Sequence, residues 1–294
     1  MKLPRLGIIS MFYARPFLAE HFDRFAAARQ AGVEFMELLV PEPGELDLAA
    51  ARAALAKAGL GVVLAARVNL TRDLASTNPE AHLAGVRYLR YCVDVASDLG
   101  APVVGGPLYG APLVFAGRAP APVEEIERQR RLSQVVSGLR TASAYAVEQG
   151  VCLALEPLNR FETDIANTTR HGLDIVEAVG SPGLGLLLDT FHMNMEDSDL
   201  GEAIRAAGRR LYHFQANENH RGFVGTGHVD WRGVCSALAD IGYAGPITLE
   251  PFRRDDERAG VPLAQWRAPH RDETPELAKS VTYLRAHLSE AFQP

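Results

Sequence analysis

Short apolar segments alternate with amphipathic segments along most of this chain. Eight apolar runs of five or six residues recur, LGIIS, FMELLV, GVVLAA, PVVGG, VCLALE, GLLLD, LYHFQA and PITLE. Nearly continuous apolar runs are typical of parallel strands that are buried on both faces. The segments 21–32, 46–59 and 82–100 carry apolar residues at helical spacing and end in glycine, which predicts amphipathic helices. Eight such alternations predict an α/β fold, a (β/α)8 TIM barrel, forming a single domain over residues 1–294.

Four of the apolar runs close on a side chain with a metal-capable oxygen. The carboxyl ends of parallel strands meet at one rim, so these side chains are expected to converge there. They are Glu156, Asp189, Gln215 and Glu250. Carboxylate and amide oxygens suit hard cations, which predicts Mn²⁺, with Co²⁺ or Mg²⁺ as alternatives. Each acid could instead cap a helix or pair with an arginine, but four at successive strand ends favour a metal site.

The two-residue repeat of a strand extends this pattern into the barrel. If Glu156 points inward, Cys152 and Ala154 do so as well, and Thr248 accompanies Glu250 in the same way. His213 shares a face with Gln215. It is expected to be a core-layer histidine or a support for a ligand rather than a ligand itself.

Other polar groups follow these strand ends at short distances. Glu162 follows Glu156 by six residues, His192 follows Asp189 by three and Arg221 follows Gln215 by six. Arg221 offers a planar fork of donors for neighbouring oxygens, and His192 can donate to a developing oxyanion. The alternative is that each only completes hydrogen bonds within its own loop.

Two long irregular segments, 106–125 and 218–231, come after the fourth and seventh strands. They lie where barrel enzymes place their sites, so they are candidates for loops that cover a substrate. Four apolar residues near the rim are possible pocket walls, although ordinary packing under loops explains them equally well. They are Phe12, Leu108, Tyr109 and Phe252.

Charge and composition restrict the classes of partner. The formal net charge of −6 argues against nucleic acid, which is bound through clustered Lys and Arg. The basic segment 128–132 is expected to be a solvated helix face. No stretch is apolar enough to span a membrane and the start lacks the pattern of a signal peptide, so a cytoplasmic protein is expected. Three scattered cysteines predict buried, reduced thiols.

Several motifs in this order resemble the signature segments of a known family. LEPLNRFETDIANT, LLDTFHMNMED, ENHRGFVGTGHVDW and ITLEPF resemble segments of the D-tagatose 3-epimerase family, which includes the D-psicose (D-allulose) and L-ribulose 3-epimerases among the xylose isomerase-like barrels. The likeness is strongest over residues 151–252, and GGPLYG is similar to the fourth-strand loop of the family. The resemblance implies a metal-dependent ketose 3-epimerase that forms a homodimer or homotetramer.

The resemblance also implies a role for each motif residue. Glu156 and Glu250 would bind the metal and act as the acid/base pair, while Asp189 and Gln215 would complete the coordination. His192 and Arg221 would bind the substrate at its O1 and O2 region. Glu162 would support this substrate-binding site. One position departs from the pattern: typical epimerases of the family have His where this chain has Gln215, whereas the related hydroxypyruvate isomerases have Gln.

The expected reaction needs no organic cofactor. Removing the proton beside a ketone requires stabilisation of an enediolate, which a cation supplies, and two carboxylates can exchange the proton on opposite faces of the carbon. The chain lacks a convincing phosphate cradle, GTGHVD being the nearest, so a free ketose is expected as the sugar substrate.

Three alternatives compete with this interpretation. Aldose–ketose isomerisation of the hydroxypyruvate isomerase type is favoured by Gln215. A nuclease like endonuclease IV is disfavoured because the third and fourth strand ends supply no His and the charge is acidic. A non-catalytic sugar-binding barrel is disfavoured because both acid/base candidates are present.

Overall fold

Eight parallel strands form the centre of the molecule. The computed structural model describes residues 2–112, 123–252 and 273–293. Within them the strands pair in chain order, and the last strand pairs with the first to close a barrel. The strands are β1 (Arg5–Ile9), β2 (Phe35–Leu39), β3 (Gly61–Ala65), β4 (Val103–Gly106), β5 (Cys152–Leu155), β6 (Leu184–Asp189), β7 (Leu211–Ala216) and β8 (Pro246–Leu249). Each falls on one of the eight apolar runs, and the closed barrel confirms the predicted fold class.

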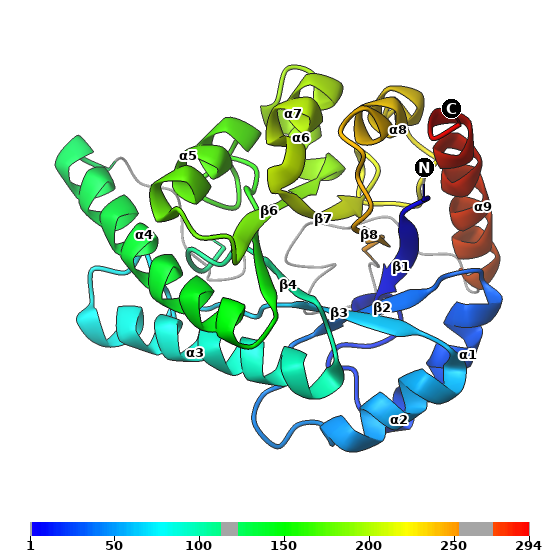
Figure 1. Ribbon diagram of the computed structural model, residues 1–294, viewed down its shortest axis with the longest axis horizontal. Helices are drawn as coiled ribbons and strands as arrows, with labels where there is room; N and C mark the ends of the chain where they lie inside the picture. The colour runs from blue at the N-terminus through cyan, green and yellow to red at the C-terminus, as the bar shows by residue number, and fades with distance from the viewer. Residues whose placement is uncertain (1, 113–122, 253–272, 294) are drawn as a thin grey trace.

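Helices surround this barrel (Figure 1). In the described ranges they are α1 (Asp23–Gln30), α2 (Leu48–Ala58), α3 (Pro79–Leu99), α4 (Glu125–Glu148), α5 (Thr169–Val179), α6 (Thr190–Glu196), α7 (Leu200–Ala207), α8 (Trp231–Asp240) and α9 (Thr274–Ala291). Three short 3-10 helices are η1 (Ser10–Phe12), η2 (Ala19–His21) and η3 (Gly208–Arg210).

The three helices predicted from periodicity are present as α1, α2 and α3. α2 begins where the Asp47 side chain accepts a hydrogen bond from the Ala50 N–H. α3 begins at Pro79, three residues before the predicted start, because Asn78 caps the helix and proline is well suited to its first position.

Inward-facing residues fill the barrel in layers. Toward the amino-terminal ends of the strands an apolar group packs together, consisting of Phe35, Val63, Val103, Ala154 and Leu187 with Cys152 and Tyr212 against it. Nearer the carboxyl ends of the strands, Glu37 and His213 form a buried polar layer. The inward orientation predicted for Cys152, Ala154 and His213 is therefore confirmed.

A local irregularity between β6 and β7 sets the register at the rim. Leu186 pairs with Leu211, but Leu187 pairs with His213, so one residue of β7 is left out of the ladder. With a regular ladder Asp189 would lie opposite Phe214. The shift instead puts Gln215 opposite Asp189, and two inward-facing polar side chains become neighbours.

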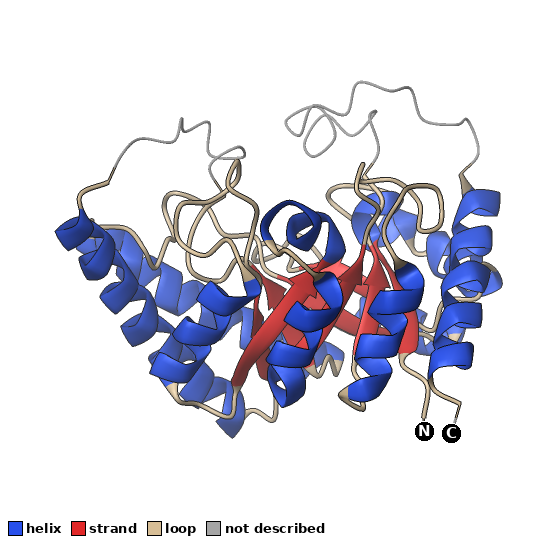
Figure 2. Cartoon of the chain, turned by 90° about the horizontal axis from the view of Figure 1, so that it is seen from above, coloured by secondary structure: helices blue, strands red, loops and turns tan. Residues whose placement is uncertain are grey.

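The loops that follow the strands gather at one end of the barrel, and the chain ends lie at the other (Figure 2). Of the two predicted covering loops, residues 218–231 are described throughout, whereas part of 106–125 lies outside the described residues. No helix in the described ranges is long and apolar enough to cross a membrane.

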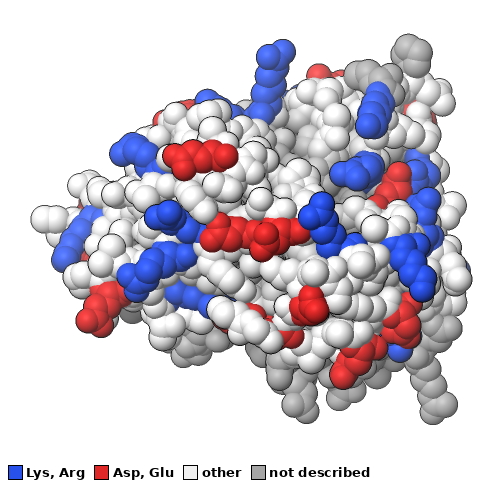
Figure 3. All heavy atoms as spheres, turned by 60° about the horizontal axis from the view of Figure 1, so that its bottom comes forward, with Lys and Arg blue, Asp and Glu red and all other residues white. Residues whose placement is uncertain are grey.

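Surface charge is mixed on the face shown in Figure 3. Basic and acidic side chains lie there in small alternating groups. The basic segment 128–132 lies on α4, where Arg128 and Arg130 are exposed as predicted. Arg131 differs because it is half-buried and pairs with Asp164 at 2.8 Å.

The three cysteines are free thiols, as the sequence predicted. Cys92 and Cys235 are buried and Cys152 is half-buried. Burial raises the pKa of Cys92 and of Cys235 to about 12, so both thiols stay protonated and unreactive near neutral pH.

The close approach of β1 to Phe35 gives a test of the barrel packing. A Cβ at Gly7 would lie within 2.5 Å of three Phe35 ring atoms, and the two residues are partners in the β1–β2 ladder. We expect Gly7→Ala to lower the free energy of unfolding by about 1–3 kcal/mol, measured by urea denaturation, because the interior is overpacked. Gly7→Ala combined with Phe35→Leu should recover part of that loss. A double variant no more stable than the single one would contradict this packing.

Candidate functional site

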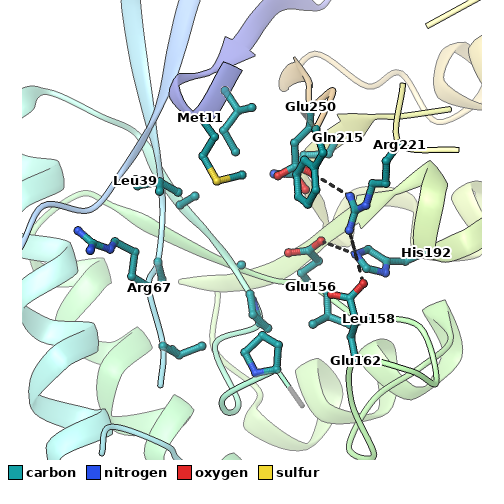
Figure 4. Close-up of a pocket in the computed structure, with 18 of the residues that line it drawn as sticks. Met11, Leu39, Arg67, Glu156, Leu158, Glu162, His192, Gln215, Arg221 and Glu250 are labelled. Atoms are coloured by element: carbon teal, nitrogen blue, oxygen red, sulfur yellow. Dashed lines mark hydrogen bonds and ion pairs between the residues drawn. The ribbon is translucent and has the colours of Figure 1, made fainter. Parts of the chain in front are cut away.

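A cavity of about 150 Å³ opens at the carboxyl ends of the strands, room for several water molecules or a small polar ligand. Its two sides differ in chemistry (Figure 4). One side carries a cluster of acidic and other polar groups. The other side carries two apolar residues, Met11 and Leu39, together with Arg67. The polar side consists of Glu156, Glu162, His192, Gln215, Arg221 and Glu250.

Strand geometry brings the predicted residues together. Glu156 directly follows β5, Asp189 ends β6, Gln215 lies in β7 and Glu250 directly follows β8. All four side chains are at most 7% exposed. Three carboxyl groups and an amide therefore share one water-poor end of the barrel, as the apolar runs predicted.

Two nitrogen donors bridge two of the carboxylates. Arg221 Nη1 donates to Asp189 Oδ2 at 2.7 Å and to Glu250 Oε2 at 3.0 Å. Asn217 Nδ2 donates to the same two oxygens, at 3.3 and 3.0 Å. These hydrogen bonds hold two like charges together, since a buried carboxylate is costly without compensating positive charge or donors.

Arg221 is held from several directions. Its guanidinium lies 4.0 Å from the ring centre of Phe191 and 4.4 Å from that of Phe252. The residue has φ 59°, in the left-handed region that side chains other than glycine rarely adopt. Its backbone N–H donates to Glu218 O and its carbonyl accepts from Phe252 N–H. Backbone strain of this kind persists only where the surroundings fix it, and it clusters at functional sites.

His192 presents one ring nitrogen to the cavity. Its Nδ1 accepts the backbone N–H of Asn159 at 3.0 Å, which assigns the proton of the neutral ring to Nε2. Nε2 lies 2.9 Å from Arg221 Nη2 and 3.5 Å from Glu156 Oε1. Two donors therefore converge on one point, and an acceptor oxygen between them would relieve their repulsion.

Glu162 lies at the edge of the same group. It accepts from Asn159 Nδ2 at 2.9 Å, and its Oε1 is 3.8 Å from Arg221 Nη2. Asn159 thus links the Glu162 side chain of the LNRFE segment to the His192 side chain of the DTFHMN segment.

Gln215 has one amide atom engaged and one free. Its Nε2 donates to Glu37 Oε1 at 3.0 Å. Its Oε1 is buried and has no hydrogen-bond partner among the described residues. An unpaired buried carbonyl oxygen costs free energy, and such an atom is suited to a cation ligand.

The donor set therefore fits a divalent cation. Ligand atoms of Glu156 and Asp189 lie within 4.8 Å of each other and of a His192 ring nitrogen. Because Nδ1 of His192 accepts from Asn159 and Nε2 carries the proton, His192 lies beside the ligands rather than among them. Glu250 lies against Asp189 through the shared donors of Arg221, and Gln215 adds its free oxygen.

The electrostatics of the group follow from burial and crowding. Burial raises the pKa of Glu156 well above its usual value, and the charges of Glu250 and Asp189 add to this. Burial likewise raises the pKa of Glu250, while Arg221 opposes the effect. Burial lowers the pKa of His192 well below its usual value, and the Arg221 charge lowers it further, so the imidazole is neutral. Acids with a raised pKa and a base with a lowered pKa around one cavity are typical of active sites.

The four residues predicted as possible pocket walls lie in different surroundings. Phe252 lines the cavity, but Phe12, Leu108 and Tyr109 are buried and are not among the described residues that line it. Their chain neighbours Met11 and Pro107 line the cavity. Phe12 packs edge-on against Phe223, with ring centres 6.0 Å apart.

Besides Asn159, sequence reasoning missed three further buried polar residues around the site. Glu37 contacts Gln215, Asn217 bridges Asp189 and Glu250, and Glu218 anchors the loop after β7 by accepting from Trp231 Nε1 at 2.7 Å. The signal for Glu37 was present, since it is a lone charge in the middle of the apolar run FMELLV. Asn217 and Glu218 gave none that distinguishes them from other loop residues.

Comparison with known proteins agrees with this geometry. The family model described as a xylose isomerase-like TIM barrel matches residues 25–286. An L-ribulose 3-epimerase of Methylomonas sp. (strain DH-1) is 33% identical over 262 residues, covering 88% of this chain and 89% of that protein. A ketose 3-epimerase of Arthrobacter globiformis is 33% identical over 238 residues, covering 79% of this chain and 80% of that protein.

Solved structures extend the likeness to the whole barrel. A structure of L-ribulose 3-epimerase superposes with a TM-score of 0.90 and 31% identity, covering 98% of this chain and 96% of that one. The chain therefore belongs to the xylose isomerase-like TIM barrel family. Within that family it groups with the ketose 3-epimerases, as its motifs predicted.

The position of Arg221 gives a test of the site electrostatics. We expect Arg221→Leu to lower the free energy of unfolding in metal-free buffer by on the order of 3 kcal/mol, because it leaves Asp189 and Glu250 buried without their cation. Arg205→Leu, which breaks an exposed pair with Asp240, is the matched control and should cost under about 1 kcal/mol. Equal losses in the two variants, measured by urea denaturation, would contradict the account.

Proposed function

We propose that the protein is a divalent-metal-dependent epimerase that inverts C3 of a free ketose through an enediolate. One observation carries the proposal: Glu156 and Glu250 are both buried, with raised pKa, at a single cavity beside Asp189 and the unpaired oxygen of Gln215. Membership among the ketose 3-epimerases supports a sugar epimerase independently of this geometry.

The cation would be held by Glu156, Asp189, Gln215 and Glu250, with His192 beside them. Bound there, a divalent cation supplies an electrophile that stabilises negative charge on the sugar oxygens as the proton leaves. The all-oxygen set of strand-end ligands favours Mn²⁺, with Co²⁺ or Mg²⁺ as alternatives. No organic cofactor is required by this chemistry.

Glu156 and Glu250 would move the protons. Epimerisation removes the C3 proton on one face of the carbon and returns a proton on the other, so it needs one carboxylate as base and one carboxylic acid. Two crowded buried carboxyl groups favour this state, because ionising both is more costly than ionising one.

Arg221 and His192 would orient the substrate. The Nη2 of Arg221 and the Nε2 of His192 converge within 2.9 Å, so one carbonyl or hydroxyl oxygen of the sugar can accept from both. Glu162 would support them by its contact with Arg221.

The far side of the cavity supports a sugar without a phosphate group. Met11 and Leu39 lie there (Figure 4), and the guanidinium of Arg67 beside them is already paired with Glu45 at 2.7 Å. We infer a free ketose as the small-molecule partner. A cytoplasmic location and assembly as a homodimer or homotetramer stay predictions.

A second candidate is aldose–ketose isomerisation, as in hydroxypyruvate isomerase. The amide at Gln215 favours it, since the resemblance drawn from the sequence associates Gln at this position with those isomerases. The same carboxylates would then move a proton between C1 and C2.

A ketose panel tests the proposal. We expect chelated protein to be inactive and Mn²⁺ to restore C3 epimerisation of at least one of D-fructose, D-tagatose and L-ribulose, followed by chromatography of the products. Hydroxypyruvate is assayed in parallel, and turnover of it with no ketose turnover would favour the second candidate. Undiminished epimerisation after complete metal removal would refute the metal requirement.

The acid/base assignment has its own test. We expect Glu156→Gln and Glu250→Gln each to lower kcat by at least about 10³-fold, since general acid–base catalysis contributes about 10²–10⁴-fold and each residue also binds the cation. Circular dichroism should show both variants folded. The exposed control Glu148→Gln on α4 should leave kcat unchanged, and near-normal kcat in either site variant would reject the role.

A further inference from the structure

We propose that Glu37 is a positioning residue that turns the amide of Gln215 so that its oxygen, not its nitrogen, faces the cation site. The inference deepens the proposed function and rests on it, because it concerns a ligand of the proposed cation. It assigns a role to a side chain that lies one layer below the cavity.

Glu37 lies inside the barrel. It is the middle residue of β2 and is 0% exposed. The alternation of the strand places Phe35, which packs in the apolar interior group, and Leu39, which lines the cavity, on the same side as Glu37. A carboxyl group at this depth must be compensated by hydrogen bonds, since burying it alone is very costly.

Both carboxyl oxygens of Glu37 have a partner. Oε1 accepts from Gln215 Nε2 at 3.0 Å, and Oε2 lies 2.9 Å from His213 Nε2. The other ring nitrogen of His213 lies 3.2 Å from the Pro246 carbonyl oxygen. Whichever atom carries the proton between Oε2 and His213, Oε1 remains an acceptor for the amide.

An acceptor on one side of an amide attracts its NH₂ group, so the amide oxygen points to the other side. If the Gln215 amide were rotated by half a turn, its oxygen would face Glu37 Oε1 and its NH₂ group would face the cavity. The first contact is repulsive, and the second would direct donors at a cation. The contact with Glu37 therefore disfavours the rotated amide, in which the NH₂ group would face the cation site.

This orientation explains the unpaired oxygen of Gln215. The atom is buried and has no hydrogen-bond partner among the described residues, a state that costs free energy. Coordination of a cation offsets that cost. Supports of this kind, one layer out from the ligands, typically change metal affinity by 10–100-fold.

The experiment is a double-mutant cycle in Mn²⁺ affinity. Chelator-treated full-length protein is titrated with Mn²⁺ by calorimetry, for the unmodified chain, Glu37→Leu, Gln215→Ala and the double variant. We expect Glu37→Leu to raise the Kd for Mn²⁺ by about 10–100-fold. In the Gln215→Ala background the same change should have little further effect, because Glu37 acts through that amide.

A conservative variant and a matched control separate positioning from general damage. Glu37→Gln keeps an acceptor oxygen for the amide and should restore most of the lost affinity. Glu34→Leu removes a carboxylate just before the same strand, at the opposite end of the barrel, where it pairs with Arg285 at 3.0 Å. It should leave the Kd unchanged, and thermal unfolding in chelator should show that every variant is folded.

The possible outcomes distinguish this inference from the proposed function. An unchanged Kd in Glu37→Leu, or losses that simply add in the double variant, would overturn the inference even if the protein epimerises ketoses. The expected pattern of Kd values would support it even if every ketose tested were unreactive. Failure of the unmodified chain to bind any divalent cation would overturn both.

Discussion

The structure depends on the compensation of negative charge at one end of the barrel. Glu156, Asp189, Glu250 and Glu162 are each at most 7% exposed, so their charges are poorly screened. In the described structure the Arg221 guanidinium compensates this negative charge. Its contacts with the rings of Phe191 and Phe252 and its left-handed backbone conformation fix it in that position. Without positive charge at this position, Asp189 and Glu250 would be buried with their charge largely uncompensated.

The same constraint continues below the rim. The Glu37–His213 contact places a second polar pair inside the barrel, directly beneath Gln215. Both oxygens of the Glu37 carboxyl group have partners on β7, so the polar layer and the rim are joined through two residues of one strand. The shifted β6–β7 register brings Asp189 opposite Gln215 and completes the link. Gln215 therefore belongs to both regions, since its amide nitrogen donates to Glu37 in the interior while it lies opposite Asp189 at the rim.

Much of this could be predicted from the sequence, for physical reasons. Parallel strands that are buried on both faces consist of nearly continuous apolar residues. A charged residue that ends such a run, as Asp189 does, therefore identifies the end of the strand and a position at the rim of the barrel. The role of Glu37 could not be predicted, since its partners His213 and Gln215 lie 176 and 178 residues away in the chain. The residues that line the cavity near η1 could not be predicted, because Met11 lines it while its neighbour Phe12 packs against Phe223, and one short helical turn gives no periodicity that distinguishes them.

The most direct test of the central claim is the position of a cation in crystals soaked with Mn²⁺, located by anomalous scattering. The account predicts one strong peak in contact with carboxyl oxygens of Glu156, Asp189 and Glu250 and with Oε1 of Gln215. The absence of a peak at this site would contradict the account. A peak at the site with Oε1 of Gln215 pointing away from it would contradict it as well.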